Sequence, residues 1–303
     1  MSLLIREEAP PGMTVSIQVD EVLFRGRTRF HNEVLIGRTP CFGKAVFMDG
    51  NAQGFESDEA VYHTALVQPA MFSHPSPKRV FIAGGGEGAT LREVLRHPEV
   101  ARATMVDIDE EAVSAFREHL PEWHQGAFED PRAVILYEDA LAFLERGEPD
   151  RYDVMVVDLG DPIQGGPSKL AYAVEFFRDL EHALAPDGIL AIQAGAFDHH
   201  RLDNLRAIRT TMAAVFPHVR AYKCSVPSFC SDWGFVMASK APLPDAPPDL
   251  ETRLARGGPD VWQHYDATGH ASTLWLSPRL RQAVQEPGRT LRRDRPILTG
   301  GPA

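Results

Sequence analysis

Arg79-Val-Phe-Ile-Ala-Gly-Gly-Gly-Glu-Gly88 decides the fold of this chain. Its apolar first half is typical of a buried parallel strand. The glycine turn comes next, and residues 89–95 predict the first turns of a helix. Strand, glycine turn and helix form the nucleotide-binding unit of doubly wound α/β folds, in which glycines let the backbone approach a ligand closely. We therefore expect Gly84 and Gly86 to lie against a nucleoside.

Acidic residues follow three further strand-like runs. Asp107 comes about twenty residues after the glycine turn, where an acid can hold both ribose hydroxyls. Asp139 follows the next run and is placed to accept a hydrogen bond from an adenine amino group. Asp158 ends the apolar run 152–157. Ligands of open α/β sheets bind beyond the carboxyl ends of the strands, so these acids and Glu87 predict a site for a nucleoside and a cationic substrate.

The run that ends at Asp158 continues as Leu-Gly-Asp161-Pro162. Two carboxylates three residues apart, held in a proline turn, can bind an amine and take a proton from it. The alternative is an ordinary acidic turn, because Asp and Pro are common turn residues. The acids at the other strand ends favour the binding site.

Several stretches, in their order and spacing, resemble the polyamine aminopropyltransferases, the family of spermidine and spermine synthases. The resemblance extends from about residue 20 to about residue 240. It is carried by Met48–Gln53, Asp58–His63, Gly84–Gly88, Asp107–Asp109, Asp139–Ala140, Asp158–Pro162, Gly166–Pro167 and Ile192–Gln193. Residues 121–128 and 226–239 look most similar to the branch of thermospermine synthases and bacterial aminopropylagmatine synthases. Glu87, where many spermidine synthases have Asp, points the same way.

The resemblance implies a specific reaction. Decarboxylated S-adenosylmethionine is the co-substrate, and no prosthetic group is expected. Its aminopropyl group passes to putrescine, agmatine or spermidine, and 5'-methylthioadenosine leaves. The reaction is a displacement at the carbon next to the sulfonium. The protein therefore has to align the two reactants and keep the attacking nitrogen unprotonated.

The residue types fit that task. A free alkylamine is protonated at neutral pH, because its pKa is roughly 10.4, so Asp158 is the expected proton acceptor. The expected amine-binding residues are Tyr62, His63, Glu87, Asp161 and Gln193. The resemblance implies that Asn32, Asp107, Asp139, Ala140 and Pro167 bind the nucleoside, and we expect Gln53, Gly84 and Gly86 to complete that pocket. Two alternatives are structural: His63 as a core histidine, and Gln193 as a buried amide bonded to the backbone.

Some positions depart from the family pattern. Asn32 stands where relatives often carry Gln, and Phe55 stands where Thr is usual. Thr64 replaces Glu, Gly160 replaces Ser, Thr or Ala, and Phe229 replaces Tyr. The expected proton acceptor and ribose acid are unaffected. These departures concern the identity of the amine acceptor. A further alternative is that this chain is an inactive member of the family that binds the nucleoside without turnover.

Two other enzyme classes share this fold. Typical methyltransferases carry an acid two residues before the first glycine, where this chain has Ile82. They have a neutral residue near Glu87, where the methionine carboxylate approaches, and an acid there repels that carboxylate. Nicotinamide-dependent dehydrogenases have a fingerprint that Gly84-x-Gly86-x-x-Ala89 loosely fits. No obvious catalytic His, Lys or Tyr set follows it.

The composition of the chain indicates which binding partners and which cellular compartment to expect. The net charge of −11 does not favour nucleic acid or an anionic membrane surface. No apolar run approaches membrane-spanning length, and the first residues lack a signal-peptide pattern. The three cysteines form no CxxC motif, which favours a reducing compartment. We expect a cytoplasmic protein. We expect no metal site, since His199-His200 lacks a third ligand.

The chain is expected to have three parts. Residues 1–72 contain short runs that predict hairpins of a small antiparallel sheet. Residues 73–240 alternate strands and helices, the Rossmann-like class that methyltransferases also adopt. Residues 241–303 begin at a proline-rich break and predict a helical extension through 262–266 and 274–284. The family resemblance implies a homodimer or a homotetramer.

Overall fold

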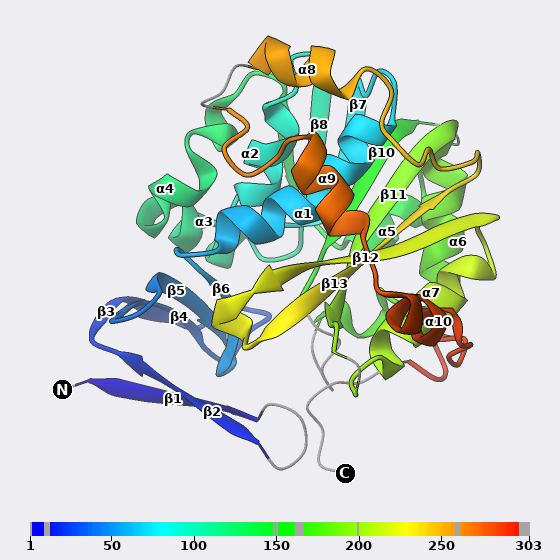
Figure 1. The fold of residues 1–303 in the computed structure, drawn as a ribbon. Coiled ribbons are helices and arrows are strands. Elements are labelled where there is room, and N and C mark those ends of the chain that lie inside the picture. Colours follow the sequence, from blue (N-terminus) through cyan, green and yellow to red (C-terminus); the bar gives the residue numbers. More distant parts are fainter. Residues whose placement is uncertain are drawn as a thin grey trace.

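The computed structural model describes residues 2–8, 13–147, 149, 151–160, 167–198, 200–257 and 261–296. In this part of the chain a small antiparallel β unit precedes a larger sheet with helices on both faces (Figure 1). The doubly wound α/β prediction is thereby confirmed. The strands are β1 (Leu3–Glu8), β2 (Thr14–Val19), β3 (Glu21–Gly26), β4 (Val34–Thr39), β5 (Gly43–Met48), β6 (Asn51–Phe55), β7 (Arg79–Gly84), β8 (Arg102–Asp107), β9 (Ala133–Tyr137), β10 (Tyr152–Asp158), β11 (Leu184–Ala196), β12 (His218–Val226) and β13 (Ser231–Ser239). The α-helices are α1 (Glu59–Ser73), α2 (Ala89–Leu95), α3 (Glu110–His119), α4 (Pro121–His124), α5 (Ala140–Glu145), α6 (Val174–Ala183), α7 (Asp203–Ala213), α8 (Leu250–Gly257), α9 (Ala267–Leu274) and α10 (Pro278–Gln285).

The larger sheet has the strand order β12-β13-β11-β10-β7-β8-β9. Its strands β7 to β11 pair in parallel, while β13 is antiparallel to both of its neighbours. The chain proceeds from β7 to β8 and β9 on one side, and then returns to place β10 on the other side of β7. The strand order thus reverses between β7 and β10, which is where ligands of doubly wound sheets bind.

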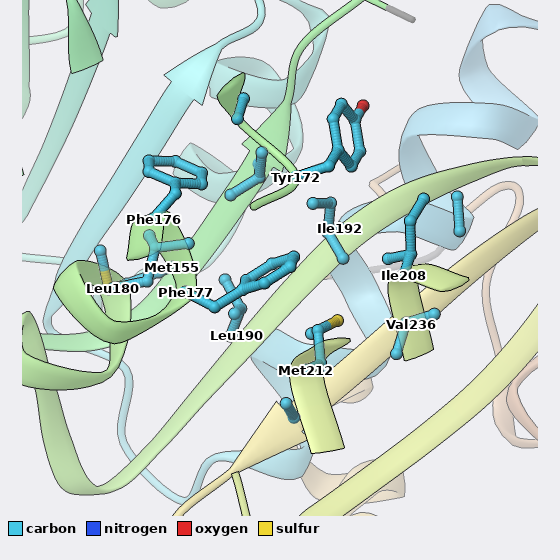
Figure 2. Packing of buried hydrophobic residues seen from close by; sticks show 14 of the residues in the cluster. Met155, Tyr172, Phe176, Phe177, Leu180, Leu190, Ile192, Ile208, Met212 and Val236 are labelled. Atoms are coloured by element: carbon cyan, nitrogen blue, oxygen red, sulfur yellow. The ribbon is translucent and has the colours of Figure 1, made fainter. Parts of the chain in front are cut away.

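Both faces of the larger sheet are buried. On β10, Met155 and Val157 belong to one hydrophobic cluster, and Val154 and Val156 belong to another on the opposite face. The first cluster includes residues of α5, α6 and α7. Figure 2 shows the part of it around Phe177 of α6 and Met212 of α7. The second packs against α1 and α2. Burial on both faces explains why the strand sequences are continuous apolar runs and do not alternate.

The small unit consists of the sheet β3-β4-β5-β6 and the hairpin β1-β2. Its central strand β4 is apolar on both faces: Val34 and Ile36 contact Phe116 and Trp123 of α3 and α4, while Leu35 packs with residues of the hairpin. The hairpin extends away from the body of the molecule (Figure 1). The small unit is therefore joined to the larger one through the helices that follow β8.

Some element boundaries differ from the sequence expectations. The helix α6 ends at Ala183, because Leu184 already pairs with Tyr152 at the start of β11. Residues 262–266 form no helix; Asp266 instead caps α9 by accepting a hydrogen bond from the main chain of Gly269. Among the described residues, no helix has both the length and the apolar character that crossing a bilayer requires.

Candidate active site

Asp158 lies at the carboxyl end of β10, next to β7, at the point where the strand order reverses. Its side chain is 9% exposed. Thr90 Oγ1 donates to Asp158 Oδ2 over 2.5 Å, and Tyr62 Oη donates to Oδ1 over 3.3 Å. Burial and the charge of Glu87 raise the pKa of Asp158, while the charge of His63 and the two hydroxyl bonds oppose the rise, so that the pKa is about 6. The carboxyl is ionised at neutral pH and close to its protonation range.

His63 lies on α1 between three carboxylates. Its Nε2 is 2.8 Å from Oε1 of Glu87 and 3.8 Å from Oδ2 of Asp158, and its Nδ1 is 3.1 Å from Oε2 of Glu59. Burial alone would lower the pKa of His63, but the bonds to Glu59 and Glu87 and the charges of Glu87 and Asp158 raise it to about 10. His63 is thus a cation at neutral pH, and it offsets the charge of the acids around it.

The side chains of His63, Glu87 and Asp158 also have a spacing that could hold a metal ion, since their ligand atoms lie within 4.8 Å of one another. A metal would bind a deprotonated imidazole nitrogen, whereas the pKa of about 10 keeps a proton there. The imidazolium of this cluster would therefore have to lose that proton before a metal could bind. The expectation of no metal site stays a prediction.

The backbone of the glycine turn after β7 lies very close to Asp158 and Asp107, as the glycines in its sequence allow. Gly84 has φ +78°, and a Cβ on it would lie 2.3 Å from the main-chain oxygen of Asp158. The same oxygen accepts a hydrogen bond from the main chain of Gly85 over 3.0 Å. A Cβ on Gly86 would lie 2.9 Å from Oδ2 of Asp107. The turn therefore packs against both strands that carry the site acids.

Asp107 ends β8 beside the glycine turn. Its Oδ1 accepts a hydrogen bond from the main chain of Asp109 over 2.9 Å. Burial, reinforced by the charge of Glu87, raises the pKa of Asp107 to about 7. Its other oxygen, Oδ2, faces Gly86, in a position suited to a ribose.

Asp139 and Ala140 begin α5 next to that strand. Asp139 is exposed, and its Oδ1 accepts a hydrogen bond from the main chain of Leu141 over 2.9 Å, so it caps the helix. Ala140 is buried. The main chain of Glu138 donates to the main-chain oxygen of Asp107 over 3.0 Å. The expected adenine-binding segment and the expected ribose acid are thus neighbours.

The expected amides lie on both sides of the turn after β10. Gln193 is buried on β11, where its Nε2 is 3.0 Å from the main-chain oxygen of Leu159 and 2.6 Å from Tyr172 Oη. Gln53 on β6 is exposed, and its Oε1 lies 3.3 Å from where a Cβ on Gly160 would be. Gln193 thus holds the turn in place from inside, and Gln53 faces it from the small unit.

Aromatic rings lie next to Tyr62, which bonds to Asp158. Phe229 lies 6.2 Å from Tyr62 and 4.7 Å from Trp233, measured between ring centroids. The segment that carries Phe229 is fixed to α1, because Asp58 accepts bonds from the main chain and the hydroxyl of Ser228 over 2.9 and 2.7 Å. An apolar wall is therefore held next to the carboxylates.

The remaining expected residues are placed as follows. Asn32 is exposed in the loop between β3 and β4, and this loop reaches α3 through a 2.5 Å hydrogen bond from Thr28 Oγ1 to Asp109 Oδ2. Pro167 begins the short 3-10 helix Pro167–Leu170. Asp161 lies outside the described residues.

The sequence does not point to Thr90, although it makes the shortest contact to Asp158. The only sequence signal is its place in the first turn after the glycines, because that turn faces the carboxyl ends of the strands. Glu59 and Arg92 contact each other next to His63 and are likewise recognisable only once α1 and α2 are packed together.

Known proteins give this arrangement a family. Residues 59–246 match the family model described as the spermine/spermidine synthase domain. The chain belongs to the spermine/spermidine synthase family. Residues 3–56 match a second model, the spermidine synthase tetramerisation domain. These two matches cover the larger sheet and the small unit in turn.

Members of the family with related sequences carry aminopropyltransferase names. Polyamine aminopropyltransferase 2 of Pseudomonas aeruginosa is 40% identical over 295 residues, which are 96% of this chain and 84% of that protein. The polyamine aminopropyltransferase of Aeropyrum pernix is 46% identical over 241 residues, which are 78% of this chain and 76% of that protein. The chain is therefore an enzyme of the aminopropyltransferase class, and the methyl-transfer and hydride-transfer alternatives are not supported.

Solved structures of spermidine synthases have the same fold. The spermidine synthase of Thermotoga maritima superposes with a TM-score of 0.82 at 26% identity, over 93% of this chain and 94% of that chain. A spermidine synthase in complex with the transition-state analogue AdoDATO superposes with a TM-score of 0.81 at 25% identity and the same coverage. The strands around the candidate site are therefore arranged as they are in these spermidine synthases.

Proposed function

We propose that this protein transfers the aminopropyl group of decarboxylated S-adenosylmethionine to an amine, with release of 5'-methylthioadenosine. The observation that carries the proposal is the meeting of Tyr62, His63, Glu87, Thr90 and Asp158 at the strand-order reversal. There the imidazolium of His63 faces the carboxylates of Glu87 and Asp158, next to a glycine turn that suits a nucleoside. The solved relative that binds a transition-state analogue supports this reading.

The donor is proposed to bind along the carboxyl ends of β7, β8 and β9. Gly84 and Gly86 hold the turn close to Asp158 and Asp107, where the nucleoside is proposed to bind, and Oδ2 of Asp107 is proposed to accept from the ribose. Asp139 and Ala140 lie beside the adenine. Asn32, Gln53 and Pro167 are proposed to complete the nucleoside pocket.

The chemical step is a single displacement. The acceptor nitrogen forms a bond to the aminopropyl carbon as the bond from that carbon to sulfur breaks, and the sulfur leaves as the neutral thioether of methylthioadenosine. The attacking nitrogen has to lose a proton, and Asp158 accepts it. The acceptor nitrogen would lie in a buried site beside the imidazolium of His63. Both the burial and the positive charge lower the pKa of that nitrogen, which favours loss of its proton.

The acceptor is proposed to be putrescine, agmatine or spermidine. Glu87 and Asp161 are proposed to bind its ammonium groups, with Tyr62, His63 and Gln193 around them. The aromatic wall formed by Tyr62, Phe229 and Trp233 suits the alkyl part of such a chain. No Ser or Cys nucleophile enters this scheme.

The test is a direct product assay. The purified protein is incubated with decarboxylated S-adenosylmethionine and a panel of amines, and the products are read by mass spectrometry. The expected result is methylthioadenosine together with an amine heavier by one aminopropyl group. S-adenosylmethionine as donor is the matched control. Tight methylthioadenosine binding without any product would favour an inactive relative.

We further propose that the chain works in the cytoplasm as a homodimer or homotetramer. The match of residues 3–56 to a tetramerisation domain supports an oligomer. The small unit also exposes apolar side chains, with Leu4 on β1 at 50% and Val22 on β3 at 47%. Light scattering during size-exclusion chromatography distinguishes the two states.

A further inference from the structure

A row of charged side chains is buried between α1 and α2 and ends at His63. The side chains of Glu59, Arg92 and Glu93 are 7%, 4% and 0% exposed. Their charges alternate along the row, starting from the imidazolium. Buried charges are tolerated when each has an opposite partner and satisfied hydrogen bonds. The row is therefore a built feature of the interface between the two helices.

The geometry around His63 determines where its protons are. Nδ1 is 2.7 Å from the main-chain oxygen of Glu59, and a carbonyl oxygen can only accept, so Nδ1 carries a proton. The same nitrogen is 3.1 Å from Oε2 of Glu59. Nε2 faces the carboxylates of Glu87 and Asp158. His63 is thus placed to donate from both nitrogens.

Glu59 cannot turn away from His63, because Arg92 holds both of its carboxylate oxygens. Arg92 Nη1 donates to Oε1 and Nη2 donates to Oε2, each over 3.0 Å. Arg92 is fixed in turn by Oε1 of Glu93 over 3.0 Å and by the main-chain oxygen of Trp123. This two-point contact sets the orientation of the carboxylate as well as its charge.

We infer that Glu59, held by Arg92, is a positioning residue that keeps His63 a double donor directed at Glu87 and Asp158. The inference deepens the proposed aminopropyl transfer and rests on it. Glu59 touches neither reactant in this scheme. It acts through His63, whose positive charge lies next to the carboxyl groups of Glu87 and Asp158 before the amine binds.

The groups that face His63 agree with this role. From α1 these are Glu59 and the ring of Tyr62, whose centroid is 4.9 Å away; from the glycine turn, Glu87; and from β10, Asp158. Three of the four are carboxylates. Removal of the Glu59 charge should therefore make the imidazolium easier to deprotonate.

The test is the variant Glu59→Gln, read first by NMR titration of His63 in the free protein. The chain has 12 histidines, so the His63 signal is assigned by its absence in His63→Gln. We expect the pKa of His63 to fall by roughly 1 to 3 pH units, because one opposite charge has this effect on a neighbour. In the assay, the loss of activity at high pH should begin at a lower pH that matches the NMR value. The double variant with His63→Gln should lack this limb.

Glu93→Gln is the matched control. It removes a buried carboxylate from the same arginine, at 3.0 Å, but Glu93 contacts Gln68 and not His63. Both variants should lose stability, whereas only Glu59→Gln should change the titration of His63. The amine acceptor has the same pKa in every assay, so its ionisation does not contribute to differences between the pH profiles of the variants.

An unchanged pKa of His63 in Glu59→Gln would overturn the inference and leave Glu59 a purely structural residue. If that variant does not fold, Glu59→Asp replaces it. The shorter side chain withdraws the carboxylate from Nδ1, so a smaller fall in the pKa is expected, and no fall overturns the inference. A wild-type protein without transfer activity would refute the proposed function, while the NMR result would still decide the role of Glu59.

Discussion

Thr90 donates a 2.5 Å hydrogen bond from Oγ1 to Oδ2 of Asp158. A bond to the charged form of a carboxyl stabilises that form and lowers its pKa. Thr90→Val should therefore raise the pKa of Asp158 above its value of about 6. Since the ionised carboxyl accepts the proton, the acidic limb of the rate should move to higher pH by about one pH unit. The pH profile of kcat under saturating substrates measures the shift.

Thr90→Ser is the control for that variant, because it keeps the hydroxyl and removes only the methyl group. It should retain the wild-type limb. An acidic limb that stays in place in Thr90→Val would show that the ionisation belongs to another group.

Asp158→Asn should remove the proton acceptor while leaving the shape of the site intact. We expect the transfer rate to fall by roughly 10² to 10⁴, the usual contribution of a general base. Methylthioadenosine binding should persist, since Asp158 is not expected to contact the nucleoside. Rapid-quench product analysis and calorimetry measure the two properties separately, and full activity would exclude Asp158 from this role.

Asp107 should make nucleoside binding depend on pH. Its pKa is about 7, so part of the population is protonated at neutral pH, while ribose hydroxyls donate best to the ionised form. Affinity for methylthioadenosine should thus rise as the pH increases through 7, with release of protons on binding. Calorimetry in buffers of different ionisation enthalpy counts these protons. Asp107→Asn should abolish the release and weaken binding by roughly 10- to 100-fold.

Glu87→Gln should relax the choice of donor. The carboxylate of S-adenosylmethionine is repelled by Glu87, and an amide removes the repulsion. We expect the preference for the decarboxylated donor to fall by about tenfold or more. Asp139→Asn is the control, because it changes an acid of the same cradle at the adenine end. An equal preference in wild type and Glu87→Gln would contradict the charge argument.

Gly84→Ala should destabilise the protein more than glycine replacement alone explains. Gly84 and Gly50 both have positive φ, +78° and +80°, but only at Gly84 would a Cβ meet backbone, 2.3 Å from Asp158 O. Gly50→Ala should cost about 1 to 2 kcal/mol for the left-handed backbone. Gly84→Ala should cost more, about 4 kcal/mol or above. Chemical denaturation measures both, and equal losses would mean that β7 and β10 can move apart.

The fold was predictable where local pattern and burial coincide. The runs at β7, β8 and β10 are apolar because both faces of the sheet are covered there, and each ends at a turn or an acid. β1 was not predictable, because Leu3–Glu8 is half polar and becomes a strand only by pairing with β2. The helix end at Ala183 depends on pairing in the same way, since Leu184 has a high helix propensity but pairs with Tyr152.

Some residues of the candidate site could likewise be predicted from the sequence, and others could not. Acids such as Asp107 and Asp158 are marked by their position at strand ends, which the sequence displays. Thr90 and Glu59 are not marked, because their contacts depend on how α2 and α1 lie on the sheet. Gln193 was expected either to bind the substrate or to be a buried amide bonded to the backbone. It is buried and donates to the main-chain oxygen of Leu159, in the turn directly after Asp158.

The short connection from β6 to α1 has a consequence for engineering. Residues 56–58 alone join the small unit to the helix that carries Tyr62 and His63, and Asp58 in that connection is bonded to Ser228. A chimera that takes its amino-terminal portion from another member of the family should therefore be joined just before Asp58. A junction after Ser73 would take Asp58 and His63 from one parent and their partners Ser228 and Glu87 from the other.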